Sequence, residues 1–251
     1  MTLFNIMWRN VKWRLQNPIC IAVTLLQPLL WLVLYSSVAG QTIGGIGIKN
    51  YTAFILPGVM VLVTFITCCS GGMINFIMIS NGSFYRVLIS PVSRCSIVLG
   101  QMFESILLSI SEAAILFVVS IFFSVNVASG ILGILIMILL IFMTAFFLSG
   151  ISYSISLQLP NEVIYETVMT AIVLPVFFMS SALFPAESLK GFMLTAVMLN
   201  PFTHVINLIR SLIFEHAIDS TKLIFTVVML LVLDILSLKL AVKSLNKESN
   251  L

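Results

Sequence analysis

The sequence predicts an all-α integral membrane fold, and its composition is the first reason. Of 251 residues, 60% are hydrophobic and 8% are charged, whereas soluble domains carry about 25% charged residues. A soluble fold must present a polar surface to water, and this chain has few polar groups for that purpose. The second reason is a series of apolar runs of the length that spans a bilayer, which is roughly 20 residues.

The first expected element is an amphipathic helix over residues 1–17 that lies in the membrane interface. Arg9 and Lys12 fall on one helical face, and Phe4 and Met7 fall on the opposite face. Trp8 flanks the apolar stripe, where indole rings favour the level of the lipid headgroups.

Six apolar segments follow, and each is long enough to span a bilayer as a helix. They cover residues 19–39, 51–80, 97–125, 131–157, 162–184 and 223–242. Residues 185–220 differ, because Asn200 and Pro201 divide them into two apolar stretches that are too short to cross. The sequence therefore predicts a short re-entrant helical hairpin at 185–220, within a single transmembrane domain over residues 1–251.

Basic residues predict the orientation of the chain. With six spans, both termini lie on one side together with the loop 81–96. That side carries 8 of the 12 basic residues, which are Arg9, Lys12, Arg14, Arg86, Arg94, Lys239, Lys243 and Lys247. The other 4 are Lys49, Lys190, Arg210 and Lys222. Because cytoplasmic loops carry an excess of Lys and Arg, we expect both termini and the loop in the cytoplasm, and the protein in the cell membrane.

The sequence offers little for catalysis or metal binding. It has no Gly-rich loop ending in Gly-Lys-Ser or Gly-Lys-Thr, the pattern that cradles ATP phosphates. The four cysteines lack metal-ligand spacing, and no other ligands accompany His204 and His216 at such spacing. A net charge of +3 is too small to indicate nucleic-acid binding. We expect no cofactor, no metal and no nucleic acid bound to this chain, and no enzymatic activity of its own.

Glu104, Glu112 and Asp234 are candidate functional carboxylates inside predicted spans, where a charged side chain is costly and needs a reason. Glu112 lies near the middle of the third span, and Glu104 lies eight residues before it on roughly the same face. Asp234 lies near the middle of the sixth span. These groups either bond between packed helices or line a path for substrate or protons, and the sequence leaves both interpretations open.

The loop 81–96 is the most polar internal segment, and it combines a helix signal with a stop signal. Its candidate functional residues are Gly82, Phe84, Tyr85, Arg86, Val87, Leu88, Pro91 and Arg94. Phe84, Val87 and Leu88 share one helical face at i, i+3 and i+4. Pro91 stops the helix, and the two arginines remain available to a partner.

This loop resembles the signature of ABC-2 type permeases, the membrane halves of a large class of ATP-binding-cassette (ABC) exporters. Residues 51–58, 174–185 and 200–210 resemble three further segments of that family, in the same order. The loop departs from the family pattern at Asn81 and Tyr85, where acidic residues are common, and at Gln101, where Lys is common. Since those acids can contact the ATPase, the docking chemistry is expected to differ in detail.

The resemblance implies a division of labour between chains. The helix of the loop would be a coupling helix that docks on a separate ABC ATPase dimer, and that dimer would bind ATP and Mg. A second copy of this chain, or a related permease, would complete the membrane part. The hairpin would form an extracellular gate with Pro185, Asn200, Pro201 and Arg210. The nearest branch is the one that exports drugs, antibiotics and polysaccharides.

The expected function is that of a permease subunit of an ABC exporter, which moves an amphipathic drug, peptide or lipid-linked substrate out of the cell. An alternative from a different class is an ion-coupled secondary carrier or channel that uses Glu112 and Asp234. A membrane-embedded enzyme is a third class, and no constellation of residues supports it.

Overall fold

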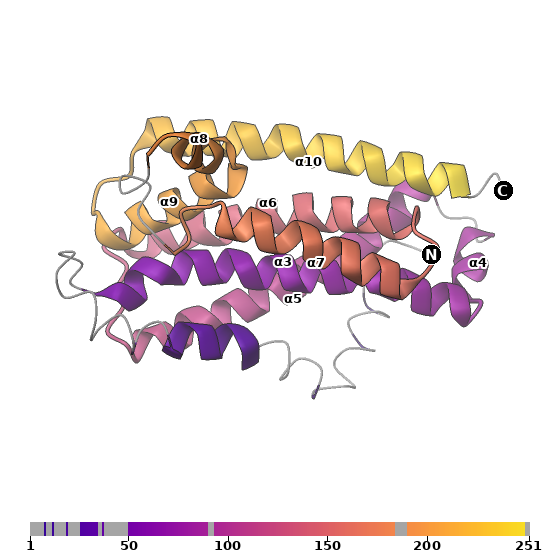
Figure 1. The fold of residues 1–251 in the computed structure, drawn as a ribbon, viewed down its shortest axis with the longest axis horizontal. Helices are drawn as coiled ribbons and strands as arrows, with labels where there is room; N and C mark the ends of the chain where they lie inside the picture. The colour runs from indigo at the N-terminus through magenta and orange to yellow at the C-terminus, as the bar shows by residue number, and fades with distance from the viewer. Residues whose placement is uncertain are drawn as a thin grey trace.

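The protein is a bundle of long helices that run side by side (Figure 1). The computed structural model describes residues 8, 12, 19, 26–34, 37, 50–89, 93–183 and 190–248, without the side chains of Val87, Leu88 and Glu248. The described residues contain no strand, which confirms the all-α prediction. The expected interfacial helix 1–17, apart from Trp8 and Lys12, lies outside the described residues, as do Pro91 and Pro185.

Four helices are long and apolar enough to cross a membrane. They are α3 (Tyr51–Ser80), α5 (Arg94–Ile121), α6 (Gly130–Ser156) and α10 (Ser220–Glu248). The other helices are α4 (Ser83–Leu88), α7 (Glu162–Phe178), α8 (Phe192–Leu199) and α9 (Pro201–Phe214). The axes of α8 and α9 are bent by 79° at their junction, and the pair brings the count to five if it is one span. The chain is therefore a multi-pass membrane protein.

The helix α3 is the centre of the bundle, and α10 lies at its edge. In α3, 89% of the most apolar stretch is buried, against 22% in α10. The neighbours of α3 are α5, α6, α7 and α9, while α10 packs mainly on α6 (Figure 1). Since both helices are strongly apolar, the exposed face of α10 is the one suited to lipid or to another membrane subunit.

Capping residues and polar turns decide where the long helices begin and end. The side chain of Asn50 caps α3 by accepting a hydrogen bond from the Ala53 N–H at 3.2 Å. Ser93 caps α5 in the same way through the Ser96 N–H, so α5 begins three residues before the predicted third span. In contrast, α10 continues beyond residue 242 as a polar helix, because helical backbone does not end where hydropathy falls.

The helix α7 is shorter than the predicted span 162–184. Its 17 residues reach about 25 Å, which is less than the roughly 30 Å of a bilayer core. After Phe178 the chain turns, and the Ser180 hydroxyl donates to the Phe177 carbonyl at 2.6 Å. Part of the predicted first span is described as helix at residues 26–34, with Leu32 in the core.

The two ends of the bundle contain different elements. One end, called the α4 end here, holds α4 and the last turns of α10 (Figure 1). The opposite end, called the α9 end, holds α9 and the turn between α5 and α6. There the Ala128 N–H donates to the Ile213 carbonyl at 3.0 Å, and the Ser129 hydroxyl donates to the Leu212 carbonyl at 2.7 Å.

Candidate functional site

The short helix α4 folds back against the end of α3. Gly82 has a φ of 66°, a left-handed conformation that glycine adopts without the steric cost of a side chain. The Ser83 hydroxyl donates to the Met78 carbonyl at 3.2 Å. The ring of Phe84 is 2% exposed and belongs to the hydrophobic core. Phe84 therefore anchors α4 to its own chain.

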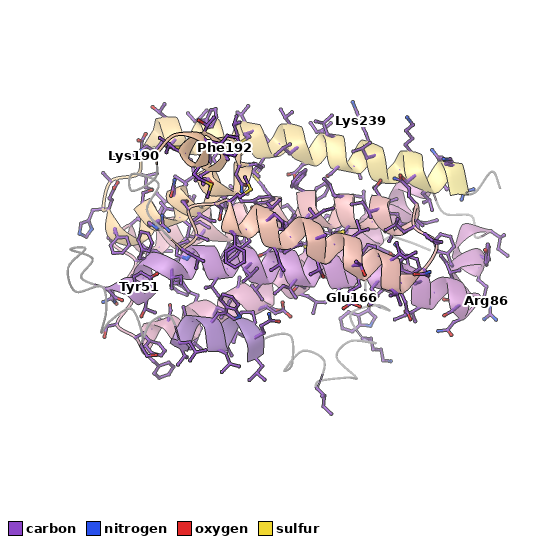
Figure 2. All side chains as sticks on the ribbon, viewed as in Figure 1. Tyr51, Arg86, Glu166, Lys190, Phe192 and Lys239 are labelled. Carbon is purple, nitrogen blue, oxygen red and sulfur yellow. The ribbon has the colours of Figure 1, made fainter. Side chains whose placement is uncertain are left out.

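Of the predicted apolar face of α4, the described side chain Phe84 is buried, and other side chains are exposed on this helix and just after it. Tyr85 is 58% exposed and Ile89 is 85% exposed, and Arg86 is exposed at the tip of the bundle (Figure 2). The spacing argument placed Phe84 on a docking face and overlooked Ile89. The hydropathy of Ile89, next to the stop signal at Ser90 and Pro91, is the signal that could have identified it.

Arg94 opens α5 and turns partly into the bundle. Its Nη1 atom is buried and has no hydrogen-bond partner among the described residues. Its positive charge acts on the phenol of Tyr153, which lies near the end of α6. Of the two predicted partner-binding arginines, Arg86 therefore faces outward and Arg94 lies between helices.

Polar side chains tie the helices together just inside the α4 end. The Asn75 amide of α3 donates to the Ser156 hydroxyl of α6 at 2.6 Å. The Gln101 amide of α5 donates to the Met78 sulfur of α3 at 3.0 Å. Because Met78 also holds Ser83 through its carbonyl, α4 is linked to α3, and α3 is linked to both α5 and α6.

The three intramembrane carboxylates are buried, and they do not form one cluster among the described residues. Glu112 of α5 accepts a hydrogen bond from the Thr67 hydroxyl of α3. Glu104 is 1% exposed. Asp234 lies on the buried stripe of α10, and its Oδ1 atom has no hydrogen-bond partner within the described part of the chain. The Glu112 contact is the one expected of a group that joins packed helices.

Asn200 joins three segments at the α9 end. Its side-chain amide donates to the carbonyls of Val176 and Met179 at 2.7 and 2.9 Å. Its carbonyl oxygen accepts from the Phe202 N–H at 3.0 Å and so caps α9. Pro201 occupies the first helical position, where its missing N–H costs no hydrogen bond. The break predicted at these two residues is thus a rigid corner.

Arg210 connects α9 to α3 and to the turn after α7. Its guanidinium donates to the Phe54 carbonyl at 3.2 Å, to the Ser181 carbonyl at 2.7 Å and to the Asn207 side chain at 3.0 Å. It also lies 3.7 Å from the centroid of the Phe54 ring, within cation–π distance. Asn200 and Arg210, predicted as gate residues, both fasten α9 to neighbouring segments.

A cavity of about 350 Å³ lies between α3, α7 and the helical segment 26–34. It is lined by Gln27, Trp31, Leu62, Ile66, Cys69, Ser70, Met73, Tyr165, Glu166, Met169, Thr170, Val173, Leu174, Phe177 and Phe178. The sequence arguments did not anticipate it, because its walls come from three helices. The pair Glu162 and Glu166, one turn apart in the first turns of an apolar helix, is a signal that could have drawn attention to it.

The long apolar helices are those of a multi-pass membrane protein. The polar contacts between them and the small outward helix α4 are consistent with a transport protein. The chain belongs to the ABC-2 type transporter family, since the family model matches residues 1–214. It is therefore a membrane component of an ABC transporter.

Relatives agree with this assignment. The chain is 26% identical over 206 residues to a protein of Cyanophora paradoxa named "Putative transport permease ycf38", and the match covers 80% of this chain and 70% of that protein. A protein of the same name from Porphyra purpurea is 25% identical over 201 residues, which cover 79% of this chain and 68% of the relative.

Proposed function

We propose that this chain is the permease subunit of an ABC exporter, and that a separate ATPase dimer docks at the α4 end. The ATPase binds ATP and Mg²⁺, and two copies of the chain, or the chain and a relative, form the membrane part. The cargo is an amphipathic drug, peptide or lipid-linked molecule. The observation that carries this proposal is α4, a short helix outside the spans with exposed Tyr85 and Arg86, together with exposed Ile89 directly after it.

The outward surface of α4 is suited to a protein partner. Ile89 is a large apolar side chain at the tip of a polar segment, and exposed apolar groups rimmed by polar ones mark interaction sites. Beside it, Arg86 can bind a carboxylate through two parallel hydrogen bonds. These groups give an ATPase both an apolar anchor and a charged contact.

The contacts behind α4 support the transmission of force into the membrane part. A push on α4 reaches α3 through buried Phe84 and through the Ser83–Met78 hydrogen bond. It reaches α5 and α6 through the bonds of Gln101 and Asn75. Packed interfaces respond to such a push by rigid-body shifts between discrete arrangements, which is the motion needed to open a path between two membrane halves.

The proposed topology has six spans, with both termini and α4 in the cytoplasm of a cell-membrane protein. The basic residues described at the α4 end support it, since Arg86, Arg94, Lys243 and Lys247 lie there. In this topology α8, α9 and residues 185–220 as a whole form an extracellular gate. The bonds of Asn200 and Arg210 hold that gate closed against α3 and α7.

The ion-coupled alternative rests on Glu112 and Asp234. The bond between Glu112 and Thr67 favours a packing role for Glu112. The geometry therefore favours the exporter, and a carrier using these residues stays a prediction.

The docking surface can be tested with Ile89→Asp and Arg86→Glu. Each variant is purified in lipid nanodiscs together with the ABC ATPase that associates with the unmodified chain. We expect normal insertion, at least tenfold weaker ATPase association and loss of ATP-driven transport, because an introduced carboxylate must be desolvated or repelled in the interface.

Lys247→Glu is the matched control, since it reverses an exposed charge on the last turn of α10 at the same end. We expect it to retain association and transport. ATP hydrolysis by the purified chain alone, or unchanged association in Ile89→Asp and Arg86→Glu, would contradict the proposal.

A further inference from the structure

We propose that the cavity between α3, α7 and residues 26–34 is a binding site for an amphipathic organic cation, with Glu166 as the counter-charge. This inference rests on the proposed function and narrows its cargo. The cavity volume of about 350 Å³ lies at the small end of the roughly 300–1,000 Å³ that is typical of small-molecule sites.

The described residues that line the cavity carry charge of one sign. Glu166 is the one charged side chain among the described residues that line it, and no Lys or Arg is among them. Glu166 is exposed at the rim of the cavity, where its carboxylate attracts a cation that approaches the apolar walls. The same carboxylate disfavours an anion of similar shape.

The walls of the cavity are apolar and aromatic. Trp31, Phe177 and Phe178 contribute rings, and the Phe177 and Phe178 ring centroids are 5.6 Å apart. Aromatic faces attract organic cations, and desolvation strengthens that attraction. A ligand with a cationic head and an apolar body therefore fits the side chains better than a neutral lipid or a sugar does.

One wall is held in place before any ligand binds. The Tyr165 hydroxyl donates to the Cys69 carbonyl of α3 at 2.7 Å and shares a hydrogen bond with Ser152 of α6. The Tyr165 ring lies 5.6 Å from the ring of Phe76. Because Tyr165 is fixed by α3 and α6, this part of the wall is preformed, which lowers the entropic cost of binding.

Glu166 and Phe177, which both line the cavity, lie at different depths along the membrane normal. Glu166 lies on the half of α7 nearer the α4 end (Figure 2), and Phe177 lies 11 residues further along the helix, which is about 16 Å. An amphipathic cation would therefore place its charge near the headgroup level at the α4 end and its apolar part deeper in the bilayer.

The test measures binding of tetraphenylphosphonium, an aromatic cation, to the full chain in nanodiscs, with empty nanodiscs as the baseline. Tetraphenylborate has the same shape and the opposite charge. We expect saturable binding of the cation, at least tenfold weaker binding of the anion, and a loss of about tenfold in cation affinity for Glu166→Gln.

Glu162→Gln is the matched control, because Glu162 is exposed one turn earlier on α7 and does not line the cavity. It should bind the cation as the unmodified chain does. A second variant, Thr170→Trp, places a large ring at an exposed lining position and should also abolish binding, with an unchanged thermal unfolding midpoint as evidence of folding.

Equal binding of both probes, or equal cation affinity in Glu166→Gln and Glu162→Gln, would overturn the inference. ATPase association is measured on the same preparations, so the two proposals fail separately. A chain that associates with the ATPase and does not bind the cation refutes the cation site alone. A chain that binds the cation through Glu166 and does not associate with the ATPase supports the site and refutes the exporter.

Discussion

The Glu112 carboxylate shows how one residue can be costly and still stabilise the fold. It is 2% exposed in the middle of α5, and it accepts a hydrogen bond from Thr67 on the central helix α3. A buried carboxylate requires such partners, since an ionised group loses its hydration on burial. At this position the bond joins α5 to α3 directionally, as the Gln101–Met78 bond does nearer the α4 end.

Thr67→Val removes this hydroxyl at nearly constant volume. We expect the free energy of unfolding to fall by about 1–3 kcal/mol, because a buried acceptor loses a hydrogen bond. The measurement is reversible unfolding of the purified chain in mixed micelles. Thr167→Val is the control, as its exposed hydroxyl bonds only within its own helix at 2.8 Å, and it should leave stability unchanged.

The same variant separates the two interpretations of Glu112. If Glu112 is a packing group, Thr67→Val keeps ATP-driven transport per folded molecule. Transport that is lost while the folded fraction is intact would assign Glu112 to a relay.

At the scale of the element, α10 is a helix with a polar start, an apolar middle and a polar end. Asp219 precedes it, and its carboxylate accepts hydrogen bonds from the N–H groups of Thr221 and Lys222 at 3.0 and 3.2 Å. The Lys222 ammonium lies 3.2 Å from the other carboxylate oxygen. These contacts cap the helix and fix its first turn outside the apolar segment.

The cap makes the first turn of α10 sensitive to acid. The Lys222 backbone N–H, followed by the Lys222 side chain, lowers the pKa of Asp219 below its ordinary value. A lowered folded-state pKa gives stability that is present above the unfolded pKa, about 4, and is lost as pH falls through the folded value. We expect amide protection at Thr221 and Lys222 to decrease below about pH 4 in hydrogen exchange.

Two substitutions check the origin of this pH dependence. Asp219→Asn keeps a capping oxygen and should give protection that does not change with pH. Asp219→Ala should lose protection at every pH. Protection in the unmodified chain that is constant through the acid range would show that the carboxylate does not cap the helix.

At the scale of the whole molecule, burial and charge vary in different directions. Burial decreases sideways from α3 to α10. Along the long axis, the described basic residues Arg86, Arg94, Lys243 and Lys247 lie at the α4 end, and Lys190, Arg210 and Lys222 lie at the α9 end. The lateral gradient suits a chain that meets lipid or another subunit around its sides. The axial gradient predicts which end lies in the cytoplasm.

Cysteine labelling tests that orientation. Ile89→Cys at the α4 end and Lys190→Cys, before α8, both introduce exposed thiols, in a background with Cys20 and Cys95 replaced by Ser. In intact cells, a membrane-impermeant maleimide should label position 190 and should reach position 89 only after permeabilisation. The background without an added cysteine is the control, and the reverse labelling pattern would contradict the proposed topology.

Most of the architecture could be predicted because its causes are local. Runs of apolar residues determined α3, α5, α6 and α10, and the Asn200-Pro201 pair determined the corner between α8 and α9. The polar loop 81–96 determined a short helix between two spans, and its motifs determined the ABC-2 type family. The end of α7 at Phe178 was not predictable from hydropathy, because the apolar run continues while serine hydroxyls bond the backbone.

The features that could not be predicted from the sequence depend on which helices contact one another. Phe84 has the same helical period whether it faces a partner or its own core, and only the packing of α4 on α3 made it an anchor. Glu166 is one acid in an apolar run until α3 and residues 26–34 form a cavity beside it. Composition and periodicity act along one chain segment, so they determined the helices and their membrane environment. Contacts between distant segments belong to tertiary structure, which alone decided the surface that faces a partner and the cavity that can hold a ligand.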